Sequence, residues 1–175
     1  MIVRSETLIA MDKFKNMDKD ILTMKLKAVE GLIRSYTNNN FQVRAMRITA
    51  PAESGALIGH SPYFKVSDTV EVSQSAVNDG LYEIKEITGG VIRLETDLYD
   101  SPYNLVTKIM YPADVQQGVI DLMLWESENR QKVGIKSETI SRHSVTYYDQ
   151  DANNQVMGYP VSLLGFLKPY MKPRF

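Results

Sequence analysis

The chain has 175 residues and a mass of 19.9 kDa, which suits one domain or one domain with a small insertion. Its 20 Lys and Arg residues against 21 Asp and Glu residues give a net charge of −1, so no overall field attracts nucleic acid or an anionic membrane. Cysteine is absent, which excludes disulfides, thiolate metal sites and cysteine nucleophiles. Two histidines, His60 and His143, are too few for a polyhistidine metal centre.

Nothing in the sequence predicts export or membrane insertion. Arg4 and Glu6 interrupt the N-terminus before the apolar core of a signal peptide could form. The longest stretch without Asp, Glu, Lys or Arg, residues 152–167, contains Gly158 and Pro160 and does not suit a spanning helix. We therefore expect a soluble protein that is found in a cytoplasm, at least initially.

Charge divides the chain into parts. Residues 1–47 carry 9 basic and 5 acidic side chains, a balance of +4. Residues 61–110 carry 4 basic and 8 acidic side chains, a balance of −4. A basic first part followed by an acidic middle predicts two units with different surfaces.

Residues 18–36 predict the first long helix. Asp18 and Asp20 are candidates for its N-cap, and Asn38 to Asn40 end it because Asn tolerates the left-handed backbone that follows many helices. The apolar residues that recur at helical spacing are Ile21, Leu22, Val29, Leu32, Ile33 and Tyr36. A shorter helix is expected at residues 6–14.

The middle of the chain predicts strands. Pro and Gly residues in 41–63 favour a strand or two with a connecting loop. Alternating patterns then predict four strands, which would form a small twisted sheet or a partly closed barrel, at residues 69–73, 81–87, 91–95 and 105–109. The runs Asn78-Asp79-Gly80 and Gly89-Gly90 predict turns, because Asn and Gly accept positive φ at low cost.

Helical structure returns near Pro112 and continues to about Arg130. One apolar stripe contains Val115, Val119, Leu122 and Met123, and another contains Ile120, Leu124 and Trp125. A helix that is apolar on two sides is expected to lie between neighbours. Residues 133–148 predict an extended or hairpin-like segment, and Tyr159-Pro160 begins a short last helix that Pro169 ends.

Motifs for catalysis or cofactors are weak. Asp149, Asp151 and Asn153 match the start of a calcium loop, but the match fails at Asn154 and Pro160. The chain has no GxSxG, GxxxxGK[ST] or GxGxxG motif, and the polar residues 137–144 are interpreted as a loop or edge strand. We therefore expect no enzyme, no cofactor and no metal. A second hypothesis is a nucleic-acid-binding or other interaction module with a small barrel. The acidic balance of residues 61–110 disfavours the binding of single-stranded nucleic acid, whose phosphates need cations.

Three stretches resemble the head–tail connector (adaptor) family of long-tailed bacteriophages, in the form found in phages of Gram-positive hosts. The first is MDKDILTMKLKAVEGLIRSYTNNNF at residues 17–41, which is similar to the early helix of these proteins. The second is PADVQQGVIDLMLW at 112–125, which looks like the long central helix. The third and most specific is VGIKSETISRHSVTY at residues 133–147, followed by Tyr159-Pro160, by Leu167-Lys168-Pro169-Tyr170 and by a basic tail.

The resemblance implies a structural virion protein of the capsid–tail neck that is assembled in the host cytoplasm. Such proteins form a ring of subunits, commonly about twelve, beneath the portal, where they extend the DNA channel and carry the stopper or tail. The partners implied are other copies of the chain, the portal protein and a stopper or tail protein. DNA would pass only through the channel, and no membrane is involved.

The fold class expected is α+β, with a small adaptor-like helical core and an inserted small antiparallel β-sheet or barrel. The core would comprise residues 1–60 and 111–175, and the inserted module residues 61–110. The basic, aromatic C-terminal tail is the hypothetical portal-docking element, through Lys168, Tyr170, Lys172, Arg174 and Phe175. Contacts with neighbouring subunits or neck partners are assigned, as a hypothesis, to Lys136, Glu138, Arg142 and Tyr147.

Overall fold

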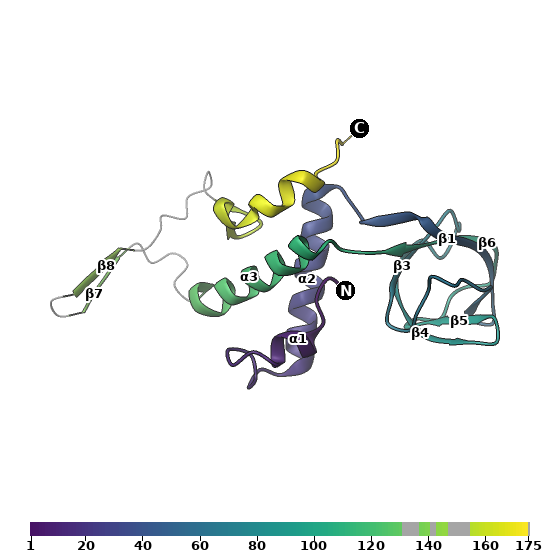
Figure 1. Ribbon diagram of the computed structural model, residues 1–175, viewed down its shortest axis with the longest axis horizontal. Coiled ribbons are helices and arrows are strands. Elements are labelled where there is room, and N and C mark those ends of the chain that lie inside the picture. The colour runs from purple at the N-terminus through teal and green to yellow at the C-terminus, as the bar shows by residue number, and fades with distance from the viewer. Residues whose placement is uncertain (131–136, 141–142, 147–154, 175) are drawn as a thin grey trace. The chain divides into compact units, whose positions relative to one another are not determined.

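The computed structural model describes residues 1–130, 137–140, 143–146 and 155–174, and for 137–140 and 143–146 it describes the backbone (Figure 1). The chain forms two compact units. The helical unit comprises Ile2–Asn38 and Pro112–Phe175, and the barrel unit comprises Asn39–Tyr111 together with Met1. The fold is therefore mixed α+β, with helices drawn from both ends of the chain and a β unit inserted between them.

The helical unit is built around two long helices. Its elements in chain order are α1 (Ser5–Ile9), α2 (Lys19–Thr37), α3 (Ala113–Asn129), β7 (Ser137–Ile140), β8 (His143–Thr146), β9 (Gln155–Val156), β10 (Tyr159–Pro160) and the 3-10 helix η2 (Val161–Tyr170). β7 and β8 pair as an antiparallel hairpin, which confirms the hairpin-like pattern for the described part of that segment. β9 pairs with β10.

Helix α2 begins and ends where the sequence predicts. The Asp18 carboxylate accepts hydrogen bonds from the backbone amides of Asp20 and Ile21, at 2.9 and 3.0 Å, and so satisfies two amides that have no partner within the helix. Asn38 follows the last turn in the left-handed conformation, with φ 49° and ψ 39°. The side chains of α2 that are buried are Leu22, Leu26, Val29, Glu30, Ile33 and Thr37.

Helix α3 buries one of its two predicted apolar stripes. Val115, Val119, Leu122 and Met123 are buried. The other stripe, Ile120, Leu124 and Trp125, is half-buried. Gly118 marks a close approach to η2, because a Cβ atom there would lie 2.5 Å from the ring of Phe166. Helix η2 extends through Pro169 to Tyr170 instead of ending at Pro169.

The barrel unit is a closed sheet of six antiparallel strands (Figure 1). The strands are β1 (Gln42–Glu53), β2 (Ala56–Ile58), β3 (Thr69–Ser73), β4 (Gly80–Thr88), β5 (Val91–Leu94) and β6 (Ser101–Ile109). Their order around the barrel is β1-β2-β5-β4-β3-β6, and β6 pairs with β1 to close it. The buried core of the barrel contains Ala50, Ala52, Leu57, Phe64, Val70, Val72, Ile84, Ile92, Leu94, Leu98 and Val106.

The barrel is larger than the module expected at residues 61–110. Residues 42–58 supply β1 and β2, and the unit begins at Asn39 and ends at Tyr111. Strand β6 also begins at Ser101, four residues earlier than the alternating pattern indicates. The physical reason is closure: without β1 and β2, strands β5 and β6 would each keep an unpaired edge.

The two predicted turns have different physical bases. Gly89 and Gly90 connect β4 to β5 with φ of 58° and 83°, as the sequence predicts for a tight hairpin. In the β3–β4 loop, by contrast, the residues with positive φ are Gln74 and Ala76, so the expectation that Asn78 and Gly80 adopt positive φ is wrong.

Asn78 serves as a buried cross-link between loops. Its side-chain amide donates to the carbonyl oxygen of Tyr99 at 2.8 Å and to Oδ1 of Asn104 at 3.2 Å, and its Oδ1 accepts from the amide of Tyr99 at 2.9 Å. Asn104 in turn donates to the carbonyl oxygen of Ala50 at 3.0 Å. These bonds tie the β3–β4 loop to the β5–β6 loop and to β1.

Because every barrel strand pairs within the unit, we expect a polypeptide of residues 39–111 to fold by itself. Circular dichroism should show a β spectrum with a cooperative thermal transition. A matched polypeptide of residues 61–110 lacks β1 and β2 and should show neither. Cooperative folding of the shorter piece would contradict the importance of closure.

Replacing Leu122 with Asp should destabilise the helical unit. Leu122 is 1% exposed, and an unpaired buried charge costs about 3–5 kcal/mol. The matched control is Leu124→Asp on the same helix, whose half-buried position should make the loss smaller. Thermal unfolding of the two variants measures the difference, and an unchanged midpoint for Leu122→Asp would refute the assignment of Leu122 to the core.

Candidate functional site

A cluster of charged and aromatic side chains joins three elements of the helical unit. The Glu126 carboxylate on α3 accepts a hydrogen bond from Lys25 Nζ of α2 at 2.6 Å and another from the Tyr159 hydroxyl of β10 at 2.6 Å. The same carboxylate lies 3.4 Å from Arg130, one turn further along the chain. We call Lys25, Trp125, Glu126, Arg130 and Tyr159 the Glu126 clamp.

Ring contacts complete the Glu126 clamp. The rings of Trp125 and Tyr159 lie 5.7 Å apart, and the Arg130 guanidinium lies 5.3 Å from the centre of the Tyr159 ring. Arg130 also donates to the carbonyl oxygen of Gly158 at 3.3 Å. Residues 130 and 158 bound the segment that contains the β7–β8 hairpin, so the clamp holds the two ends of that segment together.

The electrostatics of the clamp favour an ionised Glu126 and a neutral Tyr159. Burial of Glu126 opposes ionisation, but the hydrogen bonds from Lys25 and Tyr159 outweigh it, so the pKa of Glu126 lies below its ordinary value of 4.5. Burial raises the pKa of Tyr159 above its ordinary value of 10.0, and the hydrogen bond to the Glu126 carboxylate raises it further. The clamp therefore acts as a fixed structural joint at neutral pH.

The C-terminal tail is ordered against α2. The amide of Lys172 donates to the carbonyl oxygen of Thr37 at 2.8 Å, and Arg174 donates to the carbonyl oxygen of Ser35 at 2.7 Å. The side chain of Asn38 donates to the carbonyl oxygen of Pro173 at 2.8 Å. These bonds satisfy two carbonyls at the end of α2 that have no partner within the helix.

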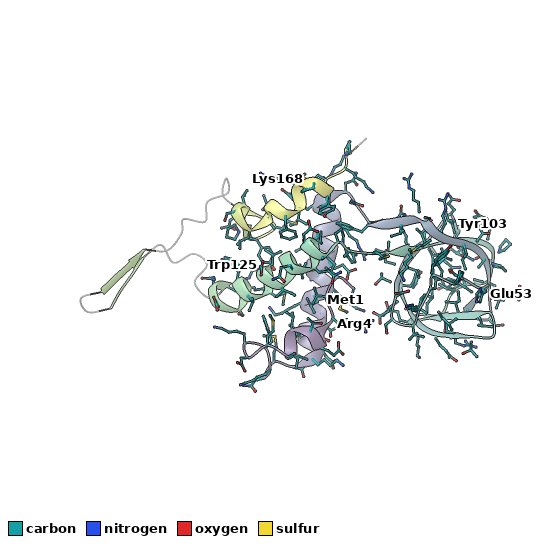
Figure 2. All side chains as sticks on the ribbon, in the orientation of Figure 1. Met1, Arg4, Glu53, Tyr103, Trp125 and Lys168 are labelled. Atoms are coloured by element: carbon teal, nitrogen blue, oxygen red, sulfur yellow. The ribbon has the colours of Figure 1, made fainter. Side chains whose placement is uncertain are left out.

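Tyr170 binds the start of α3. Its hydroxyl donates to the Asp114 carboxylate, with both oxygens 2.8 Å away. The hydrogen bond to Asp114 raises the pKa of Tyr170 above its ordinary value. The basic side chains Lys168 and Lys172 are exposed, and Figure 2 labels Lys168 on η2. The tail thus presents cations from a backbone already held by α2 and α3.

The predicted site residues fall into three groups. Lys168, Tyr170, Lys172 and Arg174 belong to η2 or the tail, and the structure brings them together at the ends of α2 and α3. Lys136, Arg142, Tyr147 and Phe175 lie outside the described residues, as does the calcium-like run Asp149 to Asn153. For Glu138 the structure describes the backbone alone, in β7, opposite Val145 of β8.

Sequence reasoning missed the Glu126 clamp. Lys25 and Glu126 are 101 residues apart, and neither lies in a recognisable motif. The one available signal was Trp125, the single tryptophan of the chain, beside an acidic residue near the end of a two-sided helix.

Within the part of the chain that the structure describes, no three His, Asp or Glu side chains gather as a metal site would need. Among the same residues, no helix is both long and apolar enough to cross a membrane. No protein-family model and no curated protein matches this chain.

The pKa shift of Glu126 predicts a pH-dependent stability. A lowered pKa in the folded state stabilises the fold above pH 4.5, the ordinary pKa, and this contribution is lost as the pH falls through the folded value. At neutral pH, Glu126→Gln should lose about 1–3 kcal/mol through its charged hydrogen bonds. The difference in thermal midpoint between the native protein and this variant should shrink below about pH 4.5.

The matched control for this prediction is Glu128→Gln. Glu128 pairs with Lys13 at 2.8 Å, but both side chains are more than half exposed. An exposed ion pair contributes at most about 1 kcal/mol. Equal effects of the two substitutions at neutral pH would mean that the clamp is no stronger than a surface pair.

Proposed function

We propose that this protein is a bacteriophage head–tail adaptor, a structural subunit of a ring beneath the portal. The observation that carries the proposal is the grouping of the three stretches that resemble the adaptor family. Residues 17–38 of the first stretch, the second stretch at 112–125, and the described residues 137–140 and 143–146 of the third belong to one helical unit, although the barrel unit, which takes residues 39–41 of the first stretch, lies between them in the sequence. This grouping supports a helical adaptor core into which the barrel is inserted.

The Glu126 clamp supports the assignment of neck contacts to the segment between Arg130 and Gly158. That segment carries Lys136, Glu138, Arg142 and Tyr147, and the clamp fixes both of its ends on α3 and β10. A segment anchored at both ends loses less conformational entropy when a partner binds it. We assign the contacts with neighbouring subunits or the stopper to these four residues.

The tail supports the assignment of portal docking to the C-terminus. Lys168 and Lys172 project from a backbone that Thr37 and Asp114 already hold in place. An ordered tail with exposed cations and a bound Tyr170 can meet an acidic surface at a small entropic cost. The portal-docking residues proposed remain Lys168, Tyr170, Lys172, Arg174 and Phe175.

Reconstitution with the portal protein of the same phage tests this function. The full chain should co-sediment with portal rings, and electron microscopy should place it at the portal vertex. A protein that ends at Met171 keeps the Tyr170–Asp114 bond and should fold, with a loss of about 1 kcal/mol for each hydrogen bond removed from α2. Its binding to the portal should fall at least about tenfold.

The matched control is Lys172→Ala, which keeps the backbone bond to Thr37 and removes one charge. It should weaken portal binding less than the truncation does, with an unchanged thermal midpoint. Unchanged binding by the truncated protein would remove the tail from the docking site. Failure of the full chain to bind the portal would refute the adaptor function.

A further inference from the structure

One end of the barrel carries exposed apolar side chains on a fixed backbone. The β1–β2 turn, the β3–β4 loop and the β5–β6 loop meet at this end, which we call the loop end (residues 53–56, 74–79 and 95–103). Val77 is 55% exposed, Tyr99 is 74% exposed and Tyr103 is 46% exposed. Tyrosine is one of the residues that most often anchor protein interfaces.

The Asn78 cross-link holds these three side chains on one platform. Asn78 follows Val77, bonds to both backbone groups of Tyr99, and bonds to Asn104, which follows Tyr103. Asn78 is 2% exposed and Asn104 is 0% exposed, so water does not compete for these bonds. A rigid platform loses little conformational entropy when a partner covers it.

The charge of the loop end indicates what kind of partner this surface can bind. Its exposed acidic residues are Glu53, Asp79, Glu95, Asp97 and Asp100. Lys and Arg are absent from residues 53–56, 74–79 and 95–103. Figure 2 shows Glu53 and Tyr103 on the same side of the barrel, in agreement with the pairing of Ala52 with Ser101. An apolar patch within an acidic rim fits a partner that presents cations around an apolar residue.

Cationic side chains near an exposed apolar residue are found toward the opposite end of the same barrel. Arg44 and Arg47 are exposed in the first half of β1, where the register with β6 shifts between Gln42 and Arg47 and the backbone bulges. Neither guanidinium has an ion-pair partner within the described part of the chain. Met110, 48% exposed, lies beside this start of β1 because its amide bonds to the carbonyl oxygen of Phe41. We call Arg44, Arg47 and Met110 the basic edge.

We propose that the loop end of one barrel docks onto the basic edge of a barrel in a second copy of this chain. The tyrosines and Val77 would cover Met110, while Glu53 and Asp97 would face Arg44 and Arg47. Because the two surfaces differ, each pair of docked copies still offers one free loop end and one free basic edge, so association continues into a ring or a chain. The inference takes its biological setting from the proposed adaptor function, but the barrel alone carries its argument.

Charge reversal of each surface provides the test. Sedimentation velocity at low salt should show concentration-dependent association of the full-length protein. The variants Glu53→Lys/Asp97→Lys and Arg44→Glu/Arg47→Glu should each associate at least about tenfold more weakly, because like charges then meet. An equal mixture of the two variants should regain association, since every contact between unlike copies again joins opposite charges.

Matched controls are Glu86→Lys and Arg93→Glu, two exposed positions paired with each other across β4 and β5. They should leave association unchanged. A native protein that stays monomeric up to about 1 mM at low salt overturns the proposal. So does a mixture of the reversed variants that remains monomeric while the native protein associates.

The outcomes separate this inference from the adaptor function. Reversed variants that still form rings on the portal would overturn the barrel contact and leave the adaptor function standing. Association through the barrels in a protein that never binds the portal would support the contact and refute the adaptor function.

Discussion

The pairing of β1 with β6 is the constraint on which the architecture depends. This ladder closes the barrel and sets Gln42 opposite Ile109, so the chain enters and leaves the barrel side by side. The amide of Met110 bonds to Phe41 at 3.1 Å, and the rings of Phe41 and Tyr111 lie 4.9 Å apart, which extends the junction beyond the ladder. Because entry and exit adjoin, helices from both ends of the sequence can share one unit.

Contacts between distant parts of the sequence also organise the helical unit. Glu126 is half-buried and would be unstable there as an isolated charge, but Lys25 and Tyr159 both donate to it. The tail then supplies partners for the carbonyls of Ser35 and Thr37 at the end of α2. In both places a polar group that a helix leaves unsatisfied is bonded by a segment far along the chain. The same bonds hold the segments to which we assign partner contacts.

The barrel shows how a nearly neutral chain can carry strongly different surfaces. Its loop end gathers carboxylates around Tyr99, whereas Arg44 and Arg47 lie in the first half of β1, away from that end. Net charge alone conceals this separation, because a fold places residues by strand direction. Antiparallel strands bring the three loops that follow β1, β3 and β5 to one end, and these loops carry the acids. An interaction surface therefore arises from topology and local composition together.

Features that depend on residues close together in the chain could be predicted from the sequence. The sequence alone determined α2 with its Asp18 cap and Asn38 terminus, the buried stripe of α3 around Leu122, and the Gly89-Gly90 turn, because caps, periodicity and positive φ depend on adjacent residues. Tertiary structure decided that residues 42–58 complete the barrel, that Asn78 is a buried cross-link rather than a turn residue, and that Lys25 meets Glu126. These features depend on strand closure and on hydrogen-bond partners up to 101 residues away, which no local pattern specifies.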